Sequence, residues 1–229
     1  MEYPHNRPYT ADDLVRIITL LRDPVNGCPW DKVQTHTSIR MNFLEEAYEA
    51  VDALDLDDPV LMCEELGDVL MQVAFHTCIE QETGRFTWEQ VCDGVCQKLI
   101  ERHPNIFGTQ PGYEGITDWD ALKNKEKGRR TLADDLESVP RAMPALMRAA
   151  KLQKRAARHG AALQGADAAA LADAAENLQT AQPASAQAEQ AVGELLFAAA
   201  NLARQAGVDP EQALQKANEA FCTAAGPVA

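Results

Sequence analysis

Residues 60–80 read VLMCEELGDVLMQVAFHTCIE, and their pattern decides the fold class. Plotted at about 100° per residue, the apolar side chains point nearly all the way round a helix. A helix that is apolar on all sides is expected to be buried. One narrow strip nevertheless carries four polar side chains: Glu65, Asp68, Gln72 and His76. Carboxylates are rarely buried without a partner or a metal, and no Lys or Arg lies on this helix, so the strip predicts bound cations.

The preceding segment, NFLEEAYEAVDAL at residues 42–54, supplies a second set of acids. Its apolar residues share one helical face, and the opposite face carries Glu45, Glu46, Glu49 and Asp52. Residues 55–59 then read DLDDP, in which Asp58 is a fitting N-cap before Pro59, so we expect an antiparallel helical hairpin. Counted from Asp57, Glu49 and Glu65 are each 8 residues away, and Glu46 and Asp68 are each 11. The two acid pairs would therefore lie at matching heights.

Four such carboxylates cannot all stay ionised without compensation. At about 4 Å and an effective dielectric constant near 20, each like-charge pair costs roughly 4 kcal/mol. Several pairs would rival the stability of a whole domain, which is about 5–15 kcal/mol. Since no His or Cys joins the set at ligand spacing, the oxygen ligands favour Mg²⁺, with Mn²⁺ as a substitute, and two such ions could activate water for attack at phosphorus. The competing interpretation is a solvated acidic face, which is ordinary for residues 42–54 alone but fits Glu65 and Asp68 poorly.

The acids, in the patterns EExxE (residues 45–49) and ExxD (residues 65–68), resemble those of the MazG nucleoside triphosphate pyrophosphohydrolases. Four further segments resemble the family in order: LRDPVNGCPWDKVQTHTS (21–38), GRFTWEQV (84–91), KLIERHPNIFG (98–108) and WDALK (119–123). The resemblance covers about residues 10–128. It implies an all-α fold, Mg²⁺ and hydrolysis of nucleoside triphosphates to monophosphate and diphosphate. It also implies that Glu46, Glu49, Glu65 and Asp68 hold metal, and that Glu45 acts on the attacking water.

Basic and aromatic residues are candidates for binding the substrate. Lys98 and Arg102 share a helix face at i,i+4 spacing, and the Arg102 guanidinium could fork onto phosphate oxygens. On spacing alone a solvated basic face explains this pair equally well, whereas the resemblance favours phosphate binding. A second pair at the same spacing is Trp119 and Lys123, whose indole could stack on a base or simply belong to the core. Trp30 and Gln34 are expected at the base end of the site, and His76 is expected to be a core histidine beside the acids.

The chain is expected to hold two domains: a MazG-like catalytic domain at residues 1–128 and a degenerate second MazG-like helical domain at residues 129–229. The repeat is faint, and its clearest trace is GDVL (67–70) against GELL (193–196). Opposite the four expected ligands stand Asn177, Thr180, Ala191 and Glu194, and opposite the basic pair stand Ala220 and Ala224. We therefore predict a catalytically inactive copy. Its Ala- and Gln-rich residues 161–191 have weak core-forming capacity, which leaves open that they are mobile.

Bulk composition narrows the class of protein. The net charge of −14 argues against a nucleic-acid surface, which needs a basic stripe. The polar N-terminus does not resemble a signal peptide, and no apolar run is long enough to span a membrane. The six cysteines form no CxxC pair, so we expect reduced thiols in a cytoplasmic protein.

Two interpretations of function and one of assembly follow. A hairpin with four acids leaves the opposite wall of a nucleotide site unfilled, so we expect a homodimer in which the partner's helices complete a four-helix bundle. The favoured function is an Mg²⁺-dependent pyrophosphohydrolase that cleans the nucleotide pool. The alternative is a non-catalytic helical protein that binds nucleotide or regulates a partner. A narrower enzymatic alternative is a specificity like that of dUTPases or phosphoribosyl-ATP pyrophosphatases.

Overall fold

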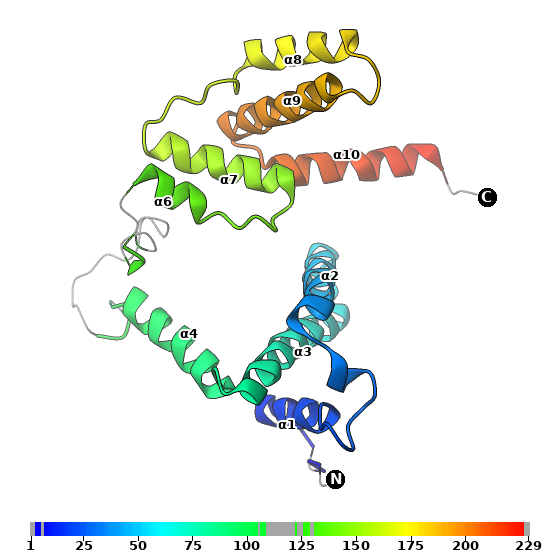
Figure 1. Ribbon diagram of the computed structural model, residues 1–229, viewed down its shortest axis with the longest axis vertical. Coiled ribbons are helices and arrows are strands. Elements are labelled where there is room, and N and C mark those ends of the chain that lie inside the picture. Colours follow the sequence, from blue (N-terminus) through cyan, green and yellow to red (C-terminus); the bar gives the residue numbers. More distant parts are fainter. Residues whose placement is uncertain are drawn as a thin grey trace. The chain divides into compact units, whose positions relative to one another are not determined.

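The computed structural model describes residues 3–5, 7–104, 106–108, 122, 126–128 and 131–226, and the chain divides into two compact units, Met1–Ile116 and Thr117–Ala229. Within these described ranges every regular element is helical, which confirms the all-α fold (Figure 1). None of the described helices combines the length and the apolar character needed to cross a membrane.

In the first unit, α3 is the central helix. The unit contains α1 (Ala11–Leu21), the short 3₁₀ helix η1 (Asp31–Val33), α2 (His36–Asp55), α3 (Pro59–Thr83) and α4 (Trp88–Arg102), and α3 packs against α1, α2 and α4. Capping boxes begin three of these helices, at Thr10, Thr35 and Thr87, where each side chain accepts a hydrogen bond from the third residue of its helix. Gly84 ends α3 at φ 70°, a left-handed conformation that glycine adopts without strain.

The core of the first unit is built on the C-terminal half of α3. Its buried residues are Val15, Ile18, Ile39, Ala74, Phe75, Cys78, Ile79 and Trp88. Full burial of one large apolar side chain contributes about 1.5–3 kcal/mol, so this cluster anchors α1, α2 and α4 to one end of α3. Arg22, just after α1, adds a two-pronged hydrogen bond to Glu82, with N–O distances of 2.6 and 2.8 Å.

The N-terminal half of α3 is not buried within the chain. Val60 is 76% exposed, Leu66 52% and Leu70 40%, and all buried residues of α3 lie from Gln72 onward. The expectation that the whole helix is buried is therefore wrong for this half. The physical reason is that the buried core cluster takes its α3 residues only from Ala74 onward. The apolar side chains in the N-terminal half of the helix therefore stay uncovered.

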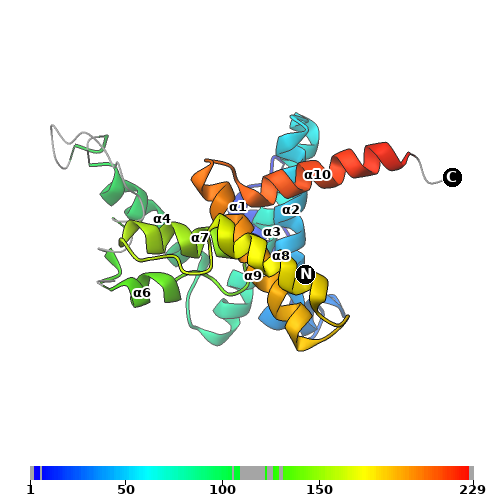
Figure 2. The same ribbon diagram turned by 90° about the horizontal axis from the view of Figure 1, so that it is seen from above.

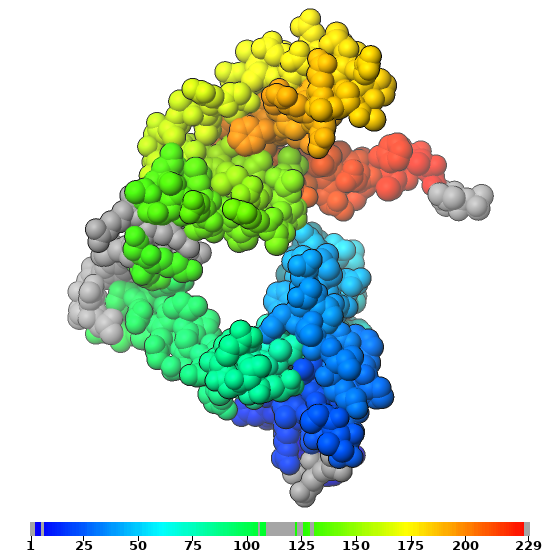
Figure 3. Space-filling view, in the orientation of Figure 1, coloured from blue at the N-terminus to red at the C-terminus, as the bar shows by residue number. Residues whose placement is uncertain are grey.

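The second unit repeats this arrangement around α9. It contains α6 (Leu132–Glu137), α7 (Ala145–Arg158), α8 (Ala168–Thr180), α9 (Ala186–Gln205) and α10 (Pro210–Ala225), and α9 packs against α7, α8 and α10. Helices α8 and α9 lie side by side in both ribbon views (Figures 1 and 2). The Ala- and Gln-rich stretch thus forms α8 and the start of α9. The C-terminal half of α10 projects from the other helices of its unit (Figure 3), and Phe221 there is 73% exposed.

The core of the second unit combines alanines with buried polar groups. Ala174, Ala191, Ala198 and Ala200 are buried at the contacts of α9 and α8. The polar groups are bonded internally: Gln153 Nε2 donates to the Phe197 carbonyl at 2.7 Å, and Asn201 Nδ2 donates to the Ala166 carbonyl at 2.6 Å. Arg155, also buried, pairs with Asp135 at 3.0 Å and ties α6 to α7. Because small side chains bury little apolar area, these bonds must carry much of the specificity of packing.

Candidate metal centre

The α2–α3 hairpin brings acids from two helices together. Its link, residues 56–58, is short, and Asp58 caps α3 by accepting hydrogen bonds from the Val60 and Leu61 amides, with Pro59 at the first helical position. The predicted N-cap is therefore confirmed. Asp57 adopts φ 52°, a left-handed conformation that Asp tolerates better than most residues, and this allows the chain to reverse. Helices α2 and α3 then run antiparallel and pack along their lengths.

Three carboxylates converge at this hairpin: those of Glu46, Glu49 and Glu65, which we call the carboxylate trio. One oxygen from each lies within 4.8 Å of the other two. Glu46 and Glu65 are half-buried and Glu49 is exposed. The structure thus joins three of the four predicted ligands. Asp68, one turn after Glu65, lies outside this 4.8 Å set but is near enough to act on Glu46 and Glu65 through its charge.

The carboxylates of the trio repel one another when no cation lies between them. Partial burial raises the pKa of Glu46, and the charge of Asp68 raises it further. A hydrogen bond from Gln72 lowers it, and the charges of Glu49 and Glu65 raise it by smaller amounts. Loss of hydration likewise raises the pKa of Glu65, followed by the charges of Glu49 and Asp68. Groups with such shifts favour either a proton or a nearby cation. The donor set is all oxygen and half open to solvent, which fits a hard divalent ion that keeps some of its water.

The polar strip of α3 continues beyond the trio into a second cluster. Gln72 Nε2 approaches Glu46 Oε1 at 3.4 Å. One turn later, His76 Nδ1 lies 2.7 Å from His36 Nδ1, and His36 Nε2 lies 2.5 Å from Glu80 Oε1. Arg85 pairs with the other oxygen of the buried Glu80 at 2.6 Å. These contacts, here called the histidine clasp, hold the first turn of α2 on α3 and so support the register that aligns the trio.

The sequence identified only part of this clasp. His76 was expected to be a core histidine, and it is half-buried between His36 and the Phe43 ring. His36 and Glu80 were not singled out. Glu80 lies at i,i+4 from His76, which is a weak signal that ordinary surface helices also show, and His36 has no such relation to a residue already named.

The remaining site candidates lie at different places in the first unit. Glu45 is exposed and adjoins Glu46 on α2, while Lys98 (exposed) and Arg102 (half-buried) lie one turn apart at the end of α4. Trp30 has an indole that is largely accessible, at 57% exposure of the residue. Gln34 is already bonded on both sides, since its Nε2 donates to the Trp30 carbonyl and its Oε1 accepts from Ser38 Oγ. Trp119 and Lys123 lie outside the described residues.

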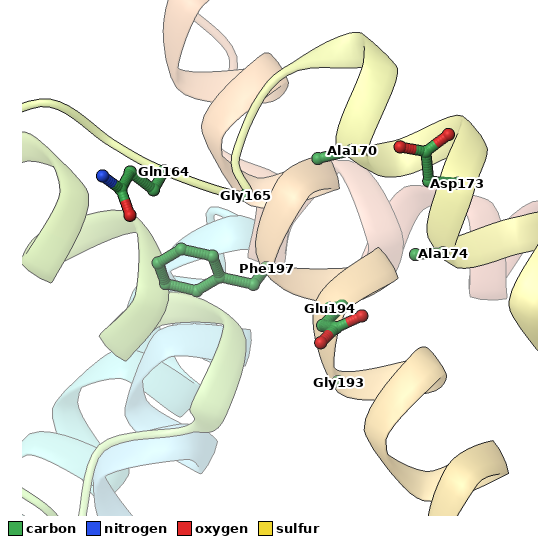
Figure 4. Close-up of a pocket in the computed structure, with 8 residues that line it drawn as sticks. All are labelled: Gln164, Gly165, Ala170, Asp173, Ala174, Gly193, Glu194 and Phe197. Carbon is green, nitrogen blue, oxygen red and sulfur yellow. The ribbon is translucent and has the colours of Figure 1, made fainter.

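The corresponding region of the second unit has no such cluster. Glu194 on α9 and Asp173 on α8 line a pocket of about 610 Å³, and their carboxylates stand well apart (Figure 4). Glu194 accepts a hydrogen bond from Gln190 at 2.8 Å. Ala191 is buried, whereas Asn177 and Thr180 are exposed. Within the described parts of the chain, the trio is the one group of three or more acid, His or Cys side chains whose ligand atoms converge.

Comparison with known proteins places this hairpin in a family. The family model for the MazG nucleotide pyrophosphohydrolase domain matches residues 34–107, which begin just after η1 and include α2, α3 and α4. The chain is 41% identical over 219 residues to the nucleoside triphosphate pyrophosphohydrolase of Escherichia coli (strain K12), covering 92% of this chain and 83% of the relative. The chain belongs to the MazG family.

Other MazG relatives support the same assignment. The nucleoside triphosphate pyrophosphohydrolase/pyrophosphatase MazG of Thermotoga maritima is 39% identical over 212 residues, covering 92% of this chain and 82% of the relative. The nucleoside triphosphate pyrophosphohydrolase of Mycobacterium tuberculosis is 35% identical over 154 residues, covering 66% of this chain and 46% of the relative. The first two matches extend over both units of this MazG chain, so the similarity is not confined to the hairpin.

Proposed function

We propose that this MazG-family protein hydrolyses nucleoside triphosphates to nucleoside monophosphate and diphosphate, with Mg²⁺ as cofactor and Mn²⁺ as a substitute. The observation that carries the proposal is the carboxylate trio, which holds three acids within 4.8 Å in a fold shared with relatives named for this reaction. We further propose that the protein is cytoplasmic and removes unwanted nucleotides from the cellular pool.

Each acid has a role in this proposal. Glu46, Glu49, Glu65 and Asp68 would hold the metal, because the raised pKa values of Glu46 and Glu65 and the clustered negative charge of the four acids favour a cation at this hairpin. When bound, the metal would supply positive charge to the triphosphate and lower the pKa of water. Glu45, exposed beside the trio, would orient the attacking water and accept its proton. Lys98 and Arg102 would bind phosphate oxygens and so offset the charge of the leaving diphosphate.

The nucleoside end of the site would be formed by residues of the η1 region and of the chain after α4. The exposed Trp30 indole is available to stack on a base, since stacking needs one open ring face. Gln34 would act by holding Trp30 and Ser38 in place, because its amide already bonds both. Trp119 and Lys123 remain proposed substrate contacts on the strength of the family resemblance.

We also propose a homodimer in which a partner completes a four-helix bundle around the hairpin. The support is the uncovered apolar surface of α2 and α3, which includes Tyr48, Val51, Leu54, Val60, Leu66 and Leu70, each at least 40% exposed. Exposed apolar side chains gathered on two adjacent helices are typical of a protein interface. Burying them would also lower the local dielectric constant around the trio and strengthen its hold on a cation.

The reaction is tested by product analysis. The purified chain, incubated with a panel of triphosphates with and without Mg²⁺, should release monophosphate and diphosphate, with little nucleoside diphosphate or orthophosphate. Orthophosphate and nucleoside diphosphate as first products would overturn the proposed reaction. Binding of nucleotide without any turnover would instead support the non-catalytic alternative, a helical nucleotide-binding or regulatory protein.

A further inference from the structure

The second unit contains a basic pocket that no part of the proposed reaction uses. It measures about 670 Å³ and lies between α7, the end of α9 and the start of α10. Four cationic side chains line it: Lys151, Lys154, Arg155 and Arg204. Its volume falls within the range of small-molecule sites, about 300–1,000 Å³.

The positive charge in this pocket is unusual for so acidic a chain. The protein has 35 acidic and 21 basic residues, so a surface cation has many carboxylates available to it. Yet among the described residues, Lys151, Lys154 and Arg204 form no ion pair, and the Arg204 guanidinium donates only to the neutral Asn201 side chain. Helix α7 itself carries no acid, and Lys151 and Lys154 repel each other at i,i+3 spacing. Three cations therefore line the pocket without an ion pair to the protein.

The nearby acids are committed to other contacts. Asp209 lines the pocket, but its Oδ1 accepts the Glu211 and Gln212 amides and caps α10. The Glu211 carboxylate accepts the Met147 amide at 3.3 Å. Asp135 forms its ion pair with Arg155. With Arg155 paired to Asp135, three cations (Lys151, Lys154 and Arg204) remain against the one carboxylate of Asp209, so the pocket has an excess of positive charge.

Arg155, which lines the pocket, supplies a second and independent observation. Its side chain is only 7% exposed, and Nη1 is bonded to Asp135 and Ser138. Its Nε, also buried, has no hydrogen-bond partner, although the side chain lines the pocket. A buried donor is normally satisfied, so this unbonded N–H shows that the protein's own acceptors do not complete the polar wall of the pocket.

We propose that this pocket binds the phosphate group of a nucleotide. Phosphate oxygens would accept charge-assisted hydrogen bonds from Lys151, Lys154 and Arg204. The apolar lining from Met143, Val208 and Pro210 offers a surface for the base or sugar, which inorganic diphosphate could not use. The inference does not rest on hydrolysis, because the pocket lies wholly in the second unit.

Calorimetric titration of the full chain tests the pocket. The titrations use AMP and inorganic diphosphate as separate probes, in EDTA and in an Arg102→Ala background, so that the proposed phosphate contact of the first unit does not contribute. Replacing both lysines (Lys151→Gln with Lys154→Gln) should raise the Kd of AMP by about tenfold or more, since two charged donors are lost. Arg204→Gln alone should raise it less, and Lys216→Gln, an exposed cation of α10 outside the pocket, should leave it unchanged.

The two probes distinguish the sources of phosphate. Tighter binding of AMP than of diphosphate supports the nucleotide. Equal or tighter binding of diphosphate overturns the nucleotide assignment and leaves a site for the inorganic anion. The pocket itself is refuted if neither probe binds below about 1 mM, or if the lysine variant and Arg204→Gln both bind AMP like the background protein.

Discussion

The two units of this protein pack their helices in the same order but use their charged residues in opposite ways. In the first, α3 contacts α1, α2 and α4, and the trio faces no Lys or Arg among the described residues. In the second, α9 contacts α7, α8 and α10, and the buried Asp135 is paired with Arg155 and approached by His159. The first unit keeps its carboxylate trio apart from internal cations, whereas the second pairs its buried acid, Asp135, within the fold.

This difference shows that the bundle and the site depend on different residues. Among the described residues of the second unit, alanines such as Ala174 and Ala198 are buried where the helices pack, and no three acids converge. Burial stabilises a fold without regard to the polar strip, so a copy can lose its acids and still pack. The comparison yields predictions at three sizes of effect, given below from the largest to the smallest.

The largest effect is expected from removing one member of the trio. Glu49→Gln should lower kcat by about 10²-fold or more, because it removes an anionic ligand from the proposed metal centre. Glu194→Gln, which changes the acid of the second unit that aligns with Asp68, should leave kcat unchanged. Steady-state kinetics at saturating Mg²⁺ measures both. Substantial hydrolysis by Glu49→Gln that disappears on adding Glu194→Gln would reveal a working second site.

The same variant separates a ligand from a structural acid. In EDTA, Glu49→Gln should unfold at the same temperature as wild type or slightly above it, because repulsion within the trio falls. Mg²⁺ should raise the unfolding temperature of wild type more than that of the variant. If the variant is unstable in EDTA and wild type ignores Mg²⁺, Glu49 has a structural role only.

An intermediate effect is expected from the basic pair of α4. Arg102→Ala should lower kcat/KM by about tenfold or more while leaving Mg²⁺ affinity unchanged, since it removes a phosphate partner and no metal ligand. The aligned residue of the second unit, Ala224, already lacks this group. Lys216→Ala on α10 is the control for loss of one surface cation. Unaltered kcat/KM in Arg102→Ala would identify Arg102 as part of a solvated face.

The smallest effect concerns the histidine clasp. Burial lowers the pKa of His76, and the neighbouring His36 lowers it further. The folded chain therefore disfavours the protonated ring, and the clasp should weaken as the pH falls below the ordinary value of 6.5. The charged groups around the pair are Glu80, which lies 2.5 Å from His36 Nε2, and Arg85, which pairs with Glu80.

Hydrogen exchange between pH 7 and pH 5 tests the clasp by comparing α2 of the first unit with α8 of the second. Protection of α2 amides should fall with pH in wild type, and less steeply in His76→Gln. Amides of α8 should show no such difference between the two proteins, because aligning Gly67 with Gly193 sets Leu202 at the position of His76. An equal slope for α2 in both proteins would rule out His76 as the titrating group.

The hairpin could be predicted from sequence because its causes are local. Helical periodicity, the Asp58–Pro59 cap and the short link fix which faces of α2 and α3 meet, and these together placed Glu46, Glu49 and Glu65 in one cluster. The clasp could not be predicted in the same way. His36 and Glu80 are 44 residues apart, and only the completed packing of the two helices brings them into contact.

Burial of α3 was mispredicted for a related reason. An all-round apolar pattern shows that a helix needs covering, but it does not show which element covers it. In the chain alone the core cluster reaches α3 only from Ala74 onward, so Val60 and Leu66 stay exposed. The same pattern is what a helix would show if its remaining cover came from a second chain.

The length of the interhelical link bears on whether the second unit could hold a convergent set of acids. Three residues join α2 to α3, whereas five, residues 181–185, join α8 to α9. Glu49 and Glu65 are 16 residues apart, whereas the aligned Thr180 and Ala191 are 11 apart, so the two hairpins do not share a register. Glu194 accordingly shares its pocket with Ala170, Asp173 and Ala174 rather than with Asn177. Acids introduced at the aligned positions are therefore not expected to converge, and a convergent site in the second unit would require a change in the length of its hairpin together with several substitutions.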